Sequence, residues 1–323
     1  MDSSLSELAL CDHAIVARAE VPHDSDDAIG TLRRAMGDMR LALVLFFVTP
    51  EADFEGLMAE AARIFVDSRC VGCTTAGEIG MSGYAEGSIV AVGFAADHFH
   101  AVLQVVTPLS ELDSTACVSQ TVRARAWLAT QAGESLPNEF AFLAVDGLSL
   151  KEDELVAAIA AGLGPMPLFG GSAADGERFS QTLISCDGVT LRNAAVVCLM
   201  RTDCPVRVFR LDHFQPTDRR MVVTTFAENP VVVRIGGQHH VRAIQRAEAN
   251  GDLQFFSAID EGLVLTLAQS QDMAAHLDRE LAGLGIETSP LTVLACDCIL
   301  RRTEVQQRQI GPEISRILAA HRV

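Results

Sequence analysis

The chain has 323 residues, of which 49% are apolar and 21% are charged, so it is long enough for about two domains and too hydrophobic to be disordered. Lysine and arginine together number 25 against 42 aspartates and glutamates, which gives a net charge of −17. No stretch gathers basic residues into a stripe, and nucleic acid is therefore excluded as an expected partner.

Hydropathy and cysteine usage predict a cytoplasmic protein with no membrane insertion. The longest unbroken apolar run, Leu41 to Val48, has the length of a strand, whereas a membrane helix needs about 20 apolar residues. The N-terminus carries acids where a secretory signal would carry lysine or arginine. Nine cysteines, an odd number lying mostly inside apolar runs, are typical of reduced thiols.

The first pattern in the chain is a buried strand, a helix and a small polar loop. Leu41 to Val48 is uniformly apolar, and apolar residues then recur every three or four positions from Phe54 to Phe65. The loop Gly72 to Glu78 follows, and Ser88 to Phe94 and His100 to Val106 are expected to be strands.

Capping signals predict two helix starts. Thr49 followed by Pro50 suits an N-cap and a first helical position. Ser149 with Glu152 three residues later forms a capping box. We therefore expect helices to begin next to Thr49 and Ser149.

The pattern recurs about 98 residues later. Aligning Gly72 with Gly170 gives 170 − 72 = 98, which indicates an internal duplication over about 40–106 and 139–209. The same offset pairs Val44 with Phe142, Leu45 with Leu143 and Thr74 with Ser172. The second copy is expected to contain the strand Phe140 to Val145 and the loop Phe169 to Glu177.

A third copy is expected to begin at the apolar run Leu291 to Ile299, followed by a helix from Val305 to Ala320 that is broken at Gly311 and Pro312. Between the second and third copies, Gly-Gly and Asn-Gly turns predict a meander of the strands Val231 to Ile235, His239 to Gln245 and Leu253 to Ile259. We expect domains at 1–210 and 211–323, the second incomplete.

These elements predict an α/β fold in which repeated strand-helix-strand units form mixed sheets covered by helices, arranged as a layered sandwich. Four further segments are informative: Gly72 to Phe94, Pro167 to Phe179, Ala258 to Ala268 and Asp297 to Arg302. These segments resemble the FIST family, in which N-terminal and C-terminal sensory domains are linked in bacterial signal transduction.

Within that family, the chain is most similar to stand-alone haem proteins that sense nitric oxide. This resemblance implies a haem cofactor and regulation of a histidine kinase or a cyclic-di-nucleotide enzyme. Family members usually carry a longer strand-helix insert after the position of Thr225 and further strands beyond Val323, both missing here.

The two glycine-rich loops are the predicted ligand site, because their small residues let backbone approach a bound group closely. The alternative is a tight packing junction between strand and helix. A small polar metabolite such as an amino acid, sensed without haem, is the alternative ligand. The predicted ligand-binding residues are Gly72, Cys73, Thr74, Thr75, Gly77, Glu78, Gly170, Gly171, Ser172 and Asp175.

Two histidines are the candidates for haem binding. His213 ranks first as the ligand to the iron, because it lies at the predicted domain junction beside Phe214. His239 ranks second, because it shares strand parity with apolar neighbours. A structural histidine is the alternative for each.

Other chemistry is less well supported. Zinc bound by Cys70, Cys73, Cys296 and Cys298 conflicts with the apolar runs that hold these pairs. No catalytic motif occurs, so we expect no enzyme, and a nucleophilic role for Cys73 ranks last. A homodimer is compatible with the sequence.

Overall fold

The computed structural model describes residues 15–176, 178–222, 244–247, 253–255, 264–284 and 292–323. The chain forms two compact units, one of Met1–Phe209, Thr288–Ile299 and Leu318–Val323 and the other of Arg210–Glu287 and Leu300–Ile317. The units interleave along the sequence, whereas we expected a single cut near residue 210. Among the described residues, no helix is long and apolar enough to cross a membrane.

The first unit contains two mixed sheets. The strands of the larger sheet are β1 (Val16–Pro22), β2 (Leu41–Val48), β3 (Arg69–Thr74), β6 (Ser88–Ala95), β10 (Ile184–Cys186) and β11 (Val189–Leu191). Those of the smaller sheet are β7 (Phe99–Val106), β8 (Asn138–Asp146), β9 (Leu168–Ala173) and β12 (Ala195–Thr202). The strand orders are β1-β6-β2-β3-β10-β11 and β7-β12-β8-β9. Only β2 with β3 and β8 with β9 pair in parallel within these two sheets.

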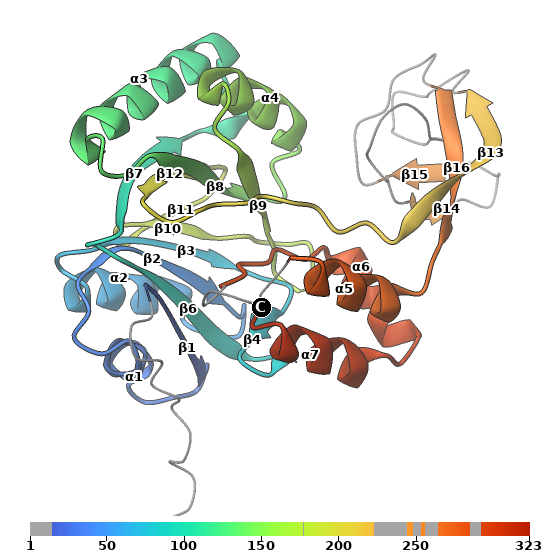
Figure 1. Ribbon diagram of the computed structural model, residues 1–323, viewed down its shortest axis with the longest axis horizontal. Coiled ribbons are helices and arrows are strands. Elements are labelled where there is room, and N and C mark those ends of the chain that lie inside the picture. The colour runs from blue at the N-terminus through green and yellow to red at the C-terminus, as the bar shows by residue number, and fades with distance from the viewer. Residues whose placement is uncertain (1–14, 177, 223–243, 248–252, 256–263, 285–291) are drawn as a thin grey trace, which may run out of the picture. The chain divides into compact units, whose positions relative to one another are not determined.

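Helices cover the outer face of each sheet, which gives four layers (Figure 1). The helices α1 (Ala28–Ala35) and α2 (Phe54–Ile64) pack on the larger sheet, and α3 (Ser114–Ala132) and α4 (Glu152–Leu163) pack on the smaller one. Short elements join them: β4 (Glu78–Gly80), β5 (Gly83–Ala85) and the 3-10 helix η1 (Leu109–Glu111). The predicted layered sandwich is confirmed.

Strand β2 shows why its sequence is apolar throughout. Val44 and Phe46 pack toward α1 and α2, whereas Leu43 and Leu45 pack toward the other sheet, against residues such as Phe142 of β8. Because consecutive side chains point to opposite faces of a strand and both faces are covered, six of the eight positions are buried, and Ala42 and Phe47 are partly buried.

The two sheets repeat one topology. The order β1-α1-β2-α2-β3-β6 in the first copy recurs as β7-α3-β8-α4-β9-β12 in the second. We expected β7 to close the first copy, but it pairs with β12 and opens the second. The hairpin β10-β11 follows β9 in sequence yet joins the first copy's sheet through β3.

The registers of the two parallel strand pairs show that the predicted offset of 98 residues between the copies does not hold after the helices α2 and α4. Gly72 lies opposite Phe46 in the first copy, and Gly171 lies opposite Ala144 in the second. The offset here is therefore 171 − 72 = 99, because α4 has 12 residues and α2 has 11. Ser172 consequently matches Cys73, and Thr74 matches Ala173.

Both predicted helix caps are wrong. Helix α2 begins at Phe54, where the Asp53 side chain accepts a hydrogen bond from the Gly56 backbone N–H (3.2 Å), while the Thr49 hydroxyl donates to Glu51. Helix α4 has Lys151 at its N-cap with no side-chain cap, because the Ser149 hydroxyl accepts from the Lys151 backbone N–H (3.3 Å) in a local turn.

The predicted strand of a third copy is also wrong. Residues 292–298 make no ladder, and Ile299 starts the helix α6 (Ile299–Gln307). The Asp297 carboxylate accepts from the Cys298 backbone N–H (2.9 Å) and from the Tyr84 hydroxyl. Such side-chain hydrogen bonds compete with strand pairing. The predicted helix break is confirmed, since α7 (Gly311–Ala320) starts anew at Gly311.

The second unit is smaller. The strands β13 (Phe214–Val222) and β16 (Val264–Ser270) pair antiparallel, as do β14 (Ile244–Ala247) and β15 (Leu253–Phe255). The pairing of β14 with β15 agrees with the predicted hairpin, but the predicted strand 231–235 lies outside the described residues. Helix α5 (Met273–Ala282) follows β16.

Gly170 and Gly171 make a matched pair for a stability test. Gly170 has φ +147°, and an added Cβ would lie 2.0 Å from the Leu143 carbonyl oxygen. An added Cβ at Gly171 would meet nothing closer than Cys296, at 3.9 Å. We expect Gly170→Ala to lower the free energy of unfolding by about 3 kcal/mol, and Gly171→Ala to change it by less than about 0.5 kcal/mol. Urea unfolding measures both, and equal effects would contradict the close approach at Gly170.

Candidate functional site

The two predicted loops lie side by side at the ends of β3 and β9. The Thr74 carbonyl accepts a hydrogen bond from the Ala174 backbone N–H (2.9 Å), and the Thr75 carbonyl accepts from that of Gly176 (3.1 Å). The Thr74 hydroxyl oxygen accepts from the Leu183 backbone N–H (3.1 Å). The duplication therefore brings its two glycine-rich segments into direct contact.

Two of the predicted ligand-binding glycines serve packing. An added Cβ at Gly72 would lie 2.3 Å from the Met58 sulfur, so this glycine lets α2 approach β3. Gly170 allows close approach to the backbone of β8 at Leu143. Gly77 has φ +123° and supplies the turn before β4. These positions fit the packing-junction alternative.

The carboxylates of Asp175 and Glu78 have hydrogen-bond partners within the protein. Asp175 is buried, and its oxygens accept 2.8 Å hydrogen bonds from the backbone N–H groups of Phe179, Ser180 and Gln181 and from the Ser180 hydroxyl. Burial raises the pKa of the Asp175 carboxyl, but these hydrogen bonds outweigh it and leave that pKa lowered. Glu78 is buried and accepts from the Thr75 hydroxyl and from Ser88. Both carboxylates therefore stabilise the loop regions that contain them.

The solvent-facing part of this region is the edge strand β9. Gly171 and Ser172 are exposed, and the Ser172 hydroxyl donates to the Glu152 carboxylate at 3.5 Å. Burial raises the pKa of Glu152. Of the predicted residues, these two offer the most accessible backbone and hydroxyl groups.

Cys70 and Cys73 of β3 point to opposite faces of the larger sheet. Cys70 packs toward α2 and Cys73 packs toward the other sheet, because a separation of three places them on opposite faces of β3. They cannot bind one metal ion together. Burial raises the pKa of each thiol to about 12, so Cys73 stays protonated at neutral pH and is a poor nucleophile.

His213 lies in the second unit and is only 3% exposed. Its Nε2 is 3.0 Å from the Glu304 carboxylate, and its ring lies 4.2 Å from that of Phe214. Glu304 also pairs with Arg308 (2.7 Å), which donates to the Ser270 hydroxyl (3.0 Å). His213 is thereby tied to α6 and to the end of β16.

His276, on α5, has one ring nitrogen that is buried without a hydrogen-bond partner among the described residues. Arg279 donates to its Nδ1 at 2.8 Å, and because a guanidinium only donates, the neutral ring carries its proton on Nε2. Burial lowers the pKa of His276, and nearby Arg279, Arg301 and His213 lower it further despite the opposing effect of Glu280. Its Nε2 is buried and has no hydrogen-bond partner among the described residues.

His276 and Glu304 are not among the site residues predicted from the sequence. His276 shares one buried face of α5 with Met273, Leu277 and Leu281, so helical periodicity was the signal that could have found it. His239, the second haem candidate, lies outside the described residues.

Comparisons with known families agree with the resemblance seen in the motifs. The FIST N domain matches residues 42–238, and the FIST C domain matches residues 208–322. Among curated proteins, none matches the chain. The two matches run in the expected order and extend over most of the sequence.

Asp175 generates a pH-dependent prediction. Because its pKa is lower in the folded protein than in the unfolded chain, its stabilisation is complete above the unfolded pKa of about 3.9 and is lost as the pH falls toward the folded pKa. We expect Asp175→Asn to lose about 1.5–3 kcal/mol of unfolding free energy at pH 7, and less as the pH falls below about 4.

Chemical denaturation at several pH values measures this difference. Asp67→Asn, at an exposed carboxylate, is the control and should change stability by less than about 0.5 kcal/mol at every pH. A loss in Asp175→Asn that does not depend on pH would contradict the role assigned to the ionised carboxylate.

Proposed function

Because the chain belongs to the FIST family, whose domains are sensory and bind ligands rather than catalyse reactions, we propose that it is a sensor of a small carboxylate metabolite in bacterial signal transduction. The proposed site is the histidine cluster of the second unit, defined as His213, His276 and Glu304. An amino acid is one ligand of this class.

One observation carries the proposal: the buried Nε2 of His276 has no partner among the described residues. A buried donor without an acceptor costs about 1–3 kcal/mol. The tautomer fixed by Arg279 makes this nitrogen a donor. A ligand oxygen placed there would recover that free energy, and a carboxylate oxygen forms the stronger, charge-assisted hydrogen bond.

Two arginines lie near the same ring nitrogen and could contact an anionic ligand. Arg279 and Arg301 lie close enough to lower the pKa of His276. The Glu280 carboxylate, 4.0 Å from Nδ1, opposes the two arginines and pairs with Arg279 at 3.4 Å. Positive charge beside a neutral imidazole donor suits a carboxylate more than an ammonium group.

Haem is the competing proposal, and the observed ring environments support it less. The Nε2 of His213 faces Glu304, so an iron atom on that nitrogen would have to displace the carboxylate. A haem-ligating histidine usually donates from its other ring nitrogen, whereas the Nδ1 of His276 accepts from Arg279. The His276 ring is therefore not arranged as an axial ligand, and His213 would have to bind iron through Nδ1. Nitric oxide sensing would follow only if haem bound through His213 or His239.

The sensory output also belongs to the proposal. The family association is with signal transduction, and we propose a histidine kinase or a cyclic-di-nucleotide enzyme as the partner that receives the signal. Co-purification of the partner with ligand-bound and ligand-free protein would test this step.

Calorimetry tests the ligand. We expect the purified protein to bind at least one member of a panel of amino acids and small carboxylic acids, and His276→Phe to weaken that binding by about tenfold or more, because one charge-assisted hydrogen bond is lost. The control is His100→Phe on β7 of the first unit, which should bind as the unaltered protein does.

A haem titration tests the competing haem proposal. A Soret shift that is abolished by His213→Ala or His239→Ala, together with no response to any carboxylate, would replace the metabolite proposal with the haem proposal. Carboxylate binding that survives His276→Phe unchanged would overturn the assignment of the site.

A further inference from the structure

A second cluster of ligand-type side chains lies in the first unit, away from the glycine-rich loops in sequence. His98 immediately precedes β7, and Asp203 and Cys204 immediately follow β12. Phe99 of β7 lies opposite Thr202 of β12. Because the strands are antiparallel, continuing this register places His98 opposite Asp203, although 105 residues separate them.

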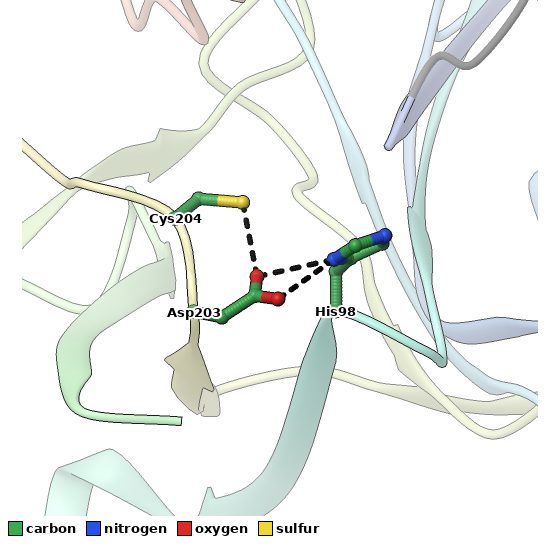
Figure 2. Close-up of side chains that lie close together, drawn as sticks. All are labelled: His98, Asp203 and Cys204. Atoms are coloured by element: carbon green, nitrogen blue, oxygen red, sulfur yellow. Dashed lines mark hydrogen bonds and ion pairs between the residues drawn. The ribbon is translucent and has the colours of Figure 1, made fainter. Parts of the chain in front are cut away.

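The three side chains point toward one another (Figure 2). The Nδ1 of His98 lies 2.9 and 3.1 Å from the two Asp203 oxygens. The Cys204 sulfur lies 3.2 Å from one of these oxygens. One nitrogen, one oxygen and one sulfur atom thus lie within 4.8 Å of one another.

The backbone of this cluster is held in place. The Cys204 backbone N–H donates to the Thr202 hydroxyl oxygen (3.1 Å), and the Asn138 amide donates to the Asp203 carbonyl (3.4 Å). The His98 backbone N–H donates to the Ala95 carbonyl (3.1 Å). These contacts fix the ends of β7 and β12, so the three side chains start from anchored positions.

We propose that His98, Asp203 and Cys204 bind a zinc ion, with water in the fourth position. Tetrahedral zinc with ligand distances of about 2.0–2.3 Å needs ligand atoms about 3.3–3.8 Å apart, so small rotations of the three side chains around the ion are sufficient.

The ligand set selects the metal. Magnesium and calcium require oxygen ligands, whereas imidazole with thiolate suits zinc or another late first-row metal. The Asp203 carboxylate and a Cys204 thiolate would supply two negative charges, and the half-exposed cluster remains open to an ion from solvent. The net charge of −17 also favours cations in general.

The alternative interpretation of this cluster is an ordinary surface ion pair between His98 and Asp203, with the Cys204 thiol beside it. Cobalt(II) distinguishes the two, because a thiolate bound to it gives a charge-transfer absorption in the near ultraviolet. We expect the reduced, metal-free full chain to bind one Co²⁺ with this band, and Zn²⁺ to displace it.

Variants assign the ligands. Cys204→Ser should abolish the thiolate band, and His98→Ala should weaken Co²⁺ binding by about tenfold or more. Zn²⁺ should raise the Tm of the unaltered protein and not that of either variant. Cys298→Ser, at another exposed cysteine, is the control and should keep the band and the Tm shift.

Two results would overturn the site. One is the absence of a thiolate band in the unaltered protein. The other is a band that survives Cys204→Ser or that disappears in Cys298→Ser. Circular dichroism confirms that each variant is folded, and His98→Ala tests the site even if Cys204→Ser fails to fold.

Discussion

The apolar layer between the two sheets is the constraint on which the first unit depends. Leu43 and Leu45 of β2 face Phe142 of β8 and Val196 of β12 across this layer, while each sheet also buries its outer face beneath helices. Burying a large apolar side chain stabilises a fold by about 1.5–3 kcal/mol. A strand covered on both faces, such as β2, therefore favours apolar side chains along its whole length.

The hairpin β10-β11 determines how the two glycine-rich loops are placed relative to each other. It belongs to the second copy in sequence but pairs with β3 of the first copy, with Ile184 opposite Cys73. This register places Leu183 beside Thr74 and brings the loop closed by Asp175 against the first glycine-rich segment. The contact between the two loops thus follows from strand exchange between copies, and not from the loops' own composition.

Periodicity predicted the layered fold because its signal is strong where both faces of a strand are buried, as in Leu41 to Val48. Local signals failed where two hydrogen-bonding arrangements compete. Ser149 can cap a helix or close a turn, and Asp53 displaced Thr49 as the cap of α2. The run 292–298 is apolar enough for a strand, but the Asp297 carboxylate accepts hydrogen bonds from the Cys298 backbone N–H and from the Tyr84 hydroxyl.

The candidate sites could be predicted only in part, for a related reason. Glycines at positions 72 and 170 mark close approaches in either a pocket or a packing junction, and only the neighbouring atoms, Met58 and Leu143, decide between them. His98 and Asp203 meet through the register of β7 with β12, which no spacing in the sequence reveals. His276 was accessible to sequence reasoning, because it follows the apolar period of α5.

Asp175 has hydrogen-bond partners within the protein, whereas the His276 Nε2 has none among the described residues, and this difference bears on how such a protein could signal. Asp175 accepts four hydrogen bonds from its own loop, so a ligand has little to add there. His276 keeps a buried donor without a partner among the described residues, which holds the ligand-free state about 1–3 kcal/mol above its satisfied counterpart. Coupling free energies between sites are typically 1–3 kcal/mol as well. Since a ligand shifts a conformational equilibrium only by its differential affinity for the two states, one such donor is enough to drive a response of that size.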